Sequence, residues 1–113
     1  NDERRQVLDK LAGFLERHGD SRFSDGKDDR TTIRDRAGWW QDEGGGRIYL
    51  FNAEGLREAL KGFDFRRALD LLEEVGALPP KQANGERARP IRIGGRPVKL
   101  YHVNADRLTD AAP

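Results

Sequence analysis

The side chains in this sequence that are best suited to binding chemistry are basic, and they gather towards its C-terminal end. Residues 79–101 contain six basic residues against a single acid, Glu86, for a net charge of +5. The whole chain has a net charge of only +1, so the remaining residues sum to −4. Clustered cations displace condensed counterions from a nucleic-acid duplex, which makes such binding strongly salt-dependent. The basic residues are Lys81, Arg87, Arg89, Arg92, Arg96 and Lys99.

Most of these cations belong to a predicted β-hairpin. Gly94-Gly95 separates two runs of β-branched and basic residues, and such a pair favours a tight two-residue turn. Arg92 and Lys99 then lie on the face opposite the apolar side chains, where they could contact phosphates. The alternative is a solvated hairpin whose Lys and Arg side chains only protect an edge strand. The expected cross-strand pairs are Ile93 with Arg96, Ile91 with Val98, and Arg89 with Leu100.

Two short helices precede this hairpin. Asn52 is placed to cap a helix over residues 53–61, and Asp64 is placed to cap the next one. Apolar residues recur at helical spacing in the second of them, which Gly76 terminates. Two helices joined by a tight glycine-containing turn predict a helix-turn-helix.

The second of these helices carries charges of both signs. Arg66 and Arg67 lie in its first turn, the part of a recognition helix that usually reaches base edges. Residues 64–74 nevertheless carry a net charge of −2, so deep insertion into a major groove would bring carboxylates close to phosphates. We therefore expect shallow docking and weak sequence specificity. The alternative is that Arg66 and Arg67 are surface charges paired with Asp70.

The N-terminal third predicts a helix followed by a long loop. Apolar residues from Val7 to Leu15 recur with the spacing of an amphipathic helix, which we expect over residues 3–18. Residues 20–36 show little periodicity and predict a loop, with Phe23 and Ile33 as possible contacts with the core.

An aromatic β-hairpin is predicted next, with residues 42–46 as its glycine-rich loop. This loop would place Gln41 opposite Arg47 and Trp39 opposite Tyr49. Its aromatic residues could stack on single-stranded bases. Packing in the core is the favoured interpretation, because a chain with only 35% hydrophobic residues needs its aromatic side chains inside. Adjacent strand residues face opposite ways, so one of Trp39 and Trp40 must point away from the other.

The order of these elements predicts an α+β fold of the winged-helix type. It has three helices, the aromatic hairpin between the first and second helix, and the C-terminal hairpin as the wing. A chain of 113 residues has the length of one domain, which we assign to residues 1–104, with residues 105–113 as a frayed tail.

Several function classes lack support in the sequence. There is no Cys for a disulfide or thiolate metal site, and no apolar run for a membrane span. Neither His18 nor His102 has a nearby Ser or Cys, and no phosphate-cradling glycine motif is present, so we expect no enzyme, metal or cofactor. The acids Asp25, Asp28 and Asp29 lack the glycine and terminal glutamate of a calcium loop. The absence of Cys fits a reducing compartment, so a cytoplasmic location is expected.

Three short motifs resemble a known family. His18–Phe23, Arg36–Trp40 and Lys61–Asp64 resemble the C-terminal region of mobile-element and prophage proteins of a domain-of-unknown-function family, which carry a helicase-type ATPase and often a primase-like module. The resemblance extends from about Leu11 to Val103. A more distant likeness is to the C-terminal winged-helix domain of conjugative relaxase/helicase proteins. The resemblance implies a DNA-handling accessory domain with its motor upstream, and no binding residue is transferred from it.

Two functions remain open at this point. The chain has no Met and begins with Asn, so we expect a segment of a longer protein. The first hypothesis is a non-catalytic domain that holds duplex or forked DNA for the upstream helicase/primase domains. The second is a module that docks a protein partner or its own upstream motor. A partly exposed Trp39 or Trp40 far from the basic hairpin would favour docking.

Overall fold

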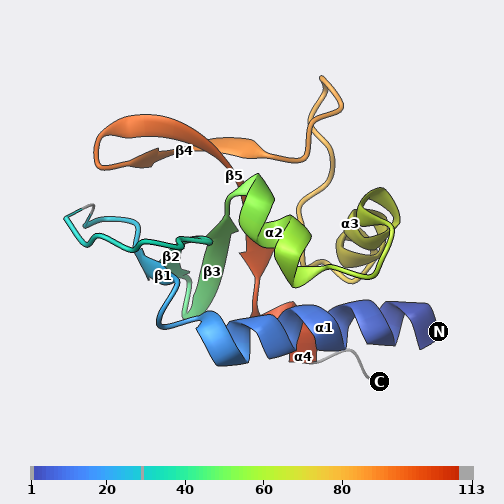
Figure 1. Ribbon diagram of the computed structural model, residues 1–113. Helices are drawn as coiled ribbons and strands as arrows, with labels where there is room; N and C mark the ends of the chain where they lie inside the picture. Colours follow the sequence, from blue (N-terminus) through green and yellow to red (C-terminus); the bar gives the residue numbers. More distant parts are fainter. Residues whose placement is uncertain (1, 29, 110–113) are drawn as a thin grey trace.

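The computed structural model describes residues 2–28 and 30–109 and shows an α+β fold (Figure 1). Within these residues it has four helices and a mixed sheet of five strands, so it holds one helix and one strand more than the winged helix predicted from the sequence. None of the described helices is long and apolar enough to cross a membrane. The elements are α1 (Asp2–His18), β1 (Phe23–Asp25), β2 (Gly38–Glu43), β3 (Gly46–Phe51), α2 (Ala53–Ala59), α3 (Phe65–Glu74), β4 (Arg89–Ile93), β5 (Arg96–Asn104) and α4 (Asp106–Thr109).

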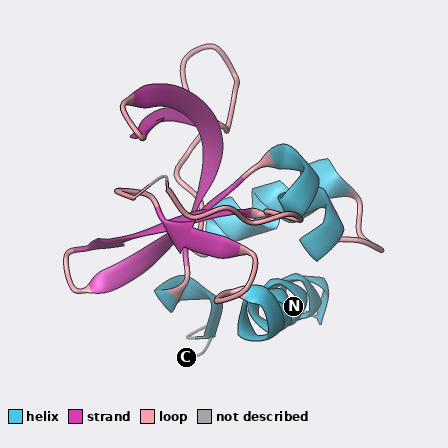
Figure 2. Ribbon diagram, turned by 60° about the vertical axis from the view of Figure 1, so that its left-hand side comes forward, coloured by secondary structure: helices cyan, strands magenta, loops and turns pink. Residues whose placement is uncertain are grey.

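The strands are ordered β1-β2-β3-β5-β4, with β1 and β2 parallel and the other pairs antiparallel. The helices gather on one side of the sheet, and the β4–β5 hairpin curls away from them (Figure 2). This C-terminal hairpin arches over β2, and its tip lies close to Gly26, the residue that follows β1. A Cβ atom added at Gly26 would lie 3.3 Å from Ile93 Cδ1. The sheet is therefore covered by helices on one face and partly by its own last hairpin on the other.

Each face of the sheet has its own apolar cluster. The larger one joins the helices to Phe51, which is fully buried and contacts the rings of Phe14 and Phe23. A smaller cluster of Leu50, Ile93 and Leu100 lies beneath the C-terminal hairpin. The two tryptophans divide between them, with Trp40 against the larger cluster and Trp39 against the smaller. The prediction that they face opposite ways is confirmed.

The predicted helices and their caps are confirmed, with small shifts at the ends. Asn52 Oδ1 accepts a hydrogen bond from the Gly55 amide at 2.6 Å, and Asp64 Oδ1 accepts one from the Arg67 amide at 2.9 Å. These bonds satisfy amide groups that have no partner inside the first helical turn. The helix α2 ends at Ala59, two residues before the expected end.

The two hairpins differ in how well the sequence predicts their register. The C-terminal hairpin has the expected pairs, because Gly94 and Gly95 have φ of 58° and 82° and close a two-residue turn. The aromatic hairpin differs from the prediction. Gly44 and Gly45 also have positive φ, 57° and 88°, and form a two-residue turn rather than the expected five-residue loop. The observed pairs are Glu43 with Gly46, Gln41 with Ile48, Trp40 with Tyr49 and Trp39 with Leu50.

The segment 20–36, of which residue 29 lies outside the described part, is not wholly the loop that was predicted. Phe23 is 2% exposed and begins the strand β1, which is only three residues long and pairs with β2. Arg22 fastens the segment by donating to Glu58 on α2 at 2.7 and 2.8 Å and to the carbonyl of Asp35 at 2.7 Å. Ile33 is half-buried.

The predicted frayed tail also differs in the structure. Its first part forms α4, and Leu108 is 2% exposed within the larger cluster. Burial of one Leu side chain contributes about 1.5–3 kcal/mol of stability. The burial of Leu108 therefore holds the short helix α4 against the larger cluster. Residues 110–113 of the predicted tail lie outside the described residues.

Candidate nucleic-acid interface

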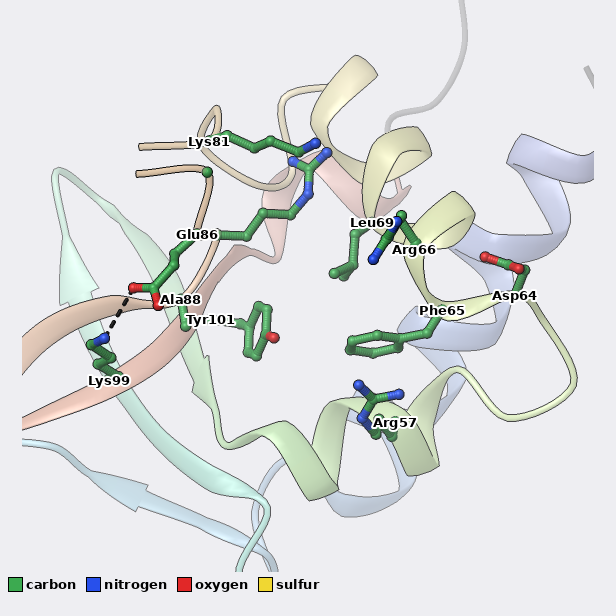
Figure 3. Close-up of a pocket in the computed structure, with 12 residues that line it drawn as sticks. Arg57, Asp64, Phe65, Arg66, Leu69, Lys81, Glu86, Ala88, Lys99 and Tyr101 are labelled. Carbon is green, nitrogen blue, oxygen red and sulfur yellow. Dashed lines mark hydrogen bonds and ion pairs between the residues drawn. The ribbon is translucent and has the colours of Figure 1, made fainter. Parts of the chain in front are cut away.

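An open groove of about 660 Å³ lies between α3, the segment that leads into β4, and β5 (Figure 3). Five basic and two acidic side chains line it, together with two aromatic rings. The groove therefore brings together cations from α2, α3, the segment before β4 and β5. The charged and aromatic lining residues are Arg57, Asp64, Phe65, Arg66, Lys81, Glu86, Arg87, Lys99 and Tyr101.

Two of these cations face the groove from opposite sides and are available for binding. Arg66 lies in the first turn of α3, and Lys81 lies on the segment across the groove (Figure 3). Both side chains are exposed, and neither forms an ion pair with any residue of the described ranges 2–28 and 30–109. Free cations at opposite sides of one groove can bind a phosphodiester backbone that runs between them.

The aromatic part of the groove comes from α3 and β5. The rings of Phe65 and Tyr101 meet edge to face, with centroids 6.1 Å apart. Both side chains are half-buried, so each keeps part of its surface open to the groove. Arg57 of α2 lies over the Phe65 ring at 4.1 Å from the centroid, and this contact holds its cation at the groove. Arg57 forms no ion pair with the residues that the structure describes.

Arg87 is the predicted binding residue whose role the structure changes most. Its side chain is only 7% exposed and pairs with Asp70 and Glu73 on α3. It therefore joins the segment before β4 to the helix and is not available to a ligand. The same ion pairs offset two of the carboxylates that were expected to oppose phosphate binding along α3.

Lys99 is at the groove but carries a local partner. Its ammonium donates to Glu86 Oε1 at 2.9 Å, and this contact lowers the pKa of the Glu86 carboxyl below its ordinary value. Both side chains are well exposed, so the pair contributes little stability, and Lys99 can exchange Glu86 for a phosphate.

The other predicted binding residues lie apart from the groove. Arg67 pairs with Glu3 of α1 at 3.4 Å and not with Asp70. Arg89 donates to the carbonyl of Pro80 at 2.6 Å. Arg92 and Arg96 are both exposed near the turn of the C-terminal hairpin, but they belong to opposite faces of it. The groove thus collects Arg66, Lys81 and Lys99 of the eight predicted residues, besides the sequestered Arg87.

Sequence reasoning missed Arg57 as a groove residue. It lies on the helix before the predicted recognition helix, and no spacing rule connects it to the C-terminal cations. The only available signal was its position in the last turn of α2, close in sequence to Phe65.

The two histidines lie in structural positions. His18 ends α1 with its ring 4.8 Å from that of Phe14. His102 Nε2 lies 3.3 Å from the carbonyl oxygen of Arg89. Asp25 accepts a hydrogen bond from the Lys27 amide and Asp28 pairs with Arg30, whereas the third acid of that loop, Asp29, lies outside the described residues. Within the part of the chain that the structure describes, no group of side chains could hold a metal ion.

We expect His102 to make the stability of the fold fall in mild acid. Burial of its ring lowers its pKa below the usual 6.5, and this effect exceeds the opposing contributions of the Arg89 carbonyl and Glu43. The folded state therefore takes up a proton less readily than the unfolded state. Its stability is complete above the unfolded pKa and is lost as the pH falls through the lowered folded pKa. Urea titrations between about pH 7 and pH 5 should show this loss, and His102→Asn should remove much of the slope. An unchanged slope would contradict the assignment.

Comparisons with models of known protein families, with curated proteins and with solved structures find no match to this chain. The function proposed for this chain therefore depends on its residues, on their geometry and on the resemblance of its three short motifs.

Proposed function

We propose that this chain is a non-catalytic DNA-binding domain that holds the phosphate backbone in the groove between α3 and the segment that leads into β4. The observation that carries the proposal is the position of Arg66 and Lys81 on opposite sides of this groove, where neither forms an ion pair with a described residue. Lys99 adds a third cation at the β5 end, and Arg92 extends the basic surface along the outer face of the C-terminal hairpin.

The contacts on α3 favour binding with low sequence specificity. Arg67 forms an exposed ion pair with Glu3 of α1, so a base edge would have to compete with Glu3 for this side chain. The middle of the helix presents the Asp70–Arg87–Glu73 cluster, which offers no free donor for a base edge. Contacts to phosphates position a protein on DNA but carry little sequence information.

The arrangement of the sheet supports a winged-helix interpretation of the domain. The second strand of the C-terminal hairpin, β5, lies between β3 and β4, and it contacts α2 and, through the Tyr101 and Phe65 rings, α3. A wing and a recognition helix need such a shared support to bind the same duplex. In this proposal the domain serves the upstream helicase/primase domains of a mobile-element protein by keeping duplex or forked DNA close to them.

Protein docking is the competing function, and the tryptophans provide a way to weigh it. Docking was expected to leave Trp39 or Trp40 partly exposed far from the basic hairpin. Trp39 instead lies beside Arg96 and Val98 of that hairpin, and Trp40 packs on the larger cluster with Arg47 over its ring. The position of Trp39 therefore gives docking no separate surface, whereas Trp40 is half-buried on the other face of the sheet and is the tryptophan that a docking partner would contact.

A charge-reversal experiment tests the proposal. We expect Arg66→Glu combined with Lys81→Glu to weaken binding of a fluorescent duplex about tenfold or more in low salt, measured by anisotropy. The slope of log affinity against log salt should fall by roughly two, since each lost phosphate contact removes about 0.9. Duplex, forked and single-stranded probes define the preferred DNA form.

The matched control reverses two charges on the exposed face of α1. Lys10→Glu combined with Arg17→Glu changes the net charge by the same amount at exposed positions that do not line the groove. This control should keep the affinity within about twofold. Undetectable binding in low salt, or an equal loss in the control, would rule out the groove as the DNA site.

A further inference from the structure

A second cationic pocket lies beneath the C-terminal hairpin, on the sheet face opposite the helices. Its volume is about 290 Å³, and the segment around Thr31 and Thr32 forms one side of it while the hairpin forms the other. None of its lining residues takes part in the groove described above. The pocket combines apolar and basic side chains, namely Ile33, Arg36, Trp39, Ile93, Arg96 and Val98.

Arg36 supplies this pocket with a positive charge that pairs with no carboxylate of the described residues. Its guanidinium donates to Ser24 Oγ at 2.9 Å, to the carbonyl of Gly38 at 2.8 Å and to the carbonyl of Thr31 at 2.9 Å. Each of these acceptors is neutral, and within residues 2–28 and 30–109 the side chain forms no ion pair with a carboxylate. Burial without a counterion lowers the pKa of Arg36 and leaves a cation that an anion would stabilise.

The rest of the pocket has the features needed to hold a phosphate and a flat apolar group together. Arg96 contributes a second cation from the hairpin turn, and its exposed side chain forms no ion pair within the described part of the chain. Trp39 is half-buried and carries the Arg36 guanidinium over its ring at 4.4 Å from the centroid. Val98, also half-buried, completes an apolar surface next to Trp39.

We propose that this pocket binds one nucleotide unit of a single-stranded nucleic acid, with the phosphate between Arg36 and Arg96 and the base against Val98 and the part of Trp39 that the Arg36 guanidinium leaves open. A duplex does not fit this chemistry, because its bases are stacked on one another and offer no free face. Single strands bind proteins through this combination of a cation for the backbone and an aromatic or apolar surface for the base. The pocket is separate from the groove, so this inference stands independently of the proposed duplex site.

The test uses Trp39 as its own reporter. A variant with Trp40→Phe leaves Trp39 as the sole tryptophan, and a short dT oligonucleotide should quench its fluorescence on binding. Arg96→Gln in this background should weaken the dT affinity about five- to tenfold. Arg34→Gln removes an equal charge from an exposed neighbour of the pocket that does not line it, and it should change the affinity less than about twofold. Arg36→Lys keeps the positive charge but replaces the planar guanidinium donors by a single ammonium group, so we expect a loss of dT affinity between those two values.

Competitors separate a nucleotide site from a simple anion site. Thymidine monophosphate should displace the oligonucleotide at much lower concentration than inorganic phosphate, because only the nucleotide supplies a base. Equal competition by the two would overturn the proposal, as would the absence of quenching in low salt. Equal losses from Arg96→Gln and Arg34→Gln would also overturn it. If the dT affinity depends on Arg66 and Lys81 instead, the groove binds single strands and the pocket does not, so the two sites are distinguished by this experiment.

Discussion

Replacing Gly38 with alanine is expected to destabilise the fold more than any other single methyl addition in the sheet. A Cβ at this position would lie 1.9 Å from the carbonyl oxygen of Leu50 and 2.8 Å from its carbonyl carbon. Both atoms belong to the backbone of the neighbouring strand, so no side-chain rotation relieves the clash. The strands β2 and β3 would have to separate where β2 begins and β3 ends. We expect a loss of roughly 3–5 kcal/mol in the free energy of unfolding, measured by urea denaturation.

A second glycine provides the control for this substitution. Gly13 lies within α1, where an added Cβ would meet only the flexible end of the Arg17 side chain at 3.2 Å. Alanine is a better helix former than glycine by about 1 kcal/mol, so Gly13→Ala should leave the stability unchanged or raise it. A Gly38→Ala variant that unfolds at the same urea concentration as the parent would show that β2 and β3 do not approach as closely as the structure indicates.

Removing Arg87 is expected to have the second-largest effect, about 2–3 kcal/mol of unfolding free energy. The Arg87 side chain is 7% exposed and bridges Asp70 and Glu73, so Arg87→Met leaves two neighbouring carboxylates without their shared cation. These carboxylates remain 43% and 36% exposed, so water screens part of their repulsion and the loss stays below that of a fully buried pair. Thermal or urea unfolding measures the change.

A triple variant separates the ion pair from the loss of packing around Arg87. Combining Arg87→Met with Asp70→Asn and Glu73→Gln removes the repulsion while keeping side chains of similar size. We expect this variant to recover about half of the lost stability, because breaking one side of an ion pair costs more than replacing all of it. No recovery would mean that Arg87 acts through its apolar stem and not through its charge.

Most of the helical structure could be predicted because its causes are local. The apolar spacing from Val7 to Leu15 identifies α1, and the caps at Asn52 and Asp64 mark the starts of α2 and α3 within a residue. The Gly94-Gly95 turn determines the register of the C-terminal hairpin for the same reason. In each case the decisive interaction lies within a few residues of its signal.

The elements that could not be predicted depend on distant partners. The strand β1 has only three residues, and its backbone is extended because it pairs with the edge of β2. A segment this short has no periodicity in its sequence that could predict this pairing. Leu108 holds α4 in place through contact with a core built mainly from earlier residues. The register of the aromatic hairpin was wrong because three consecutive glycines permit more than one turn, and pairing along both strands selects among them.

The candidate site shows the same division between sequence and structure. The sequence by itself determined that positive charge is concentrated in residues 79–101 and that Arg66 and Arg67 begin the third helix. Only the tertiary structure decided how each cation is used. Folding brings Arg87 against Asp70 and Glu73 and Arg67 against Glu3. Arg66 and Lys81 instead lie on opposite sides of a groove and form no ion pair within residues 2–28 and 30–109. The physical reason is that the effect of a charge depends on its solvation and on its nearest opposite charge, and both are set by contacts between residues far apart in the chain.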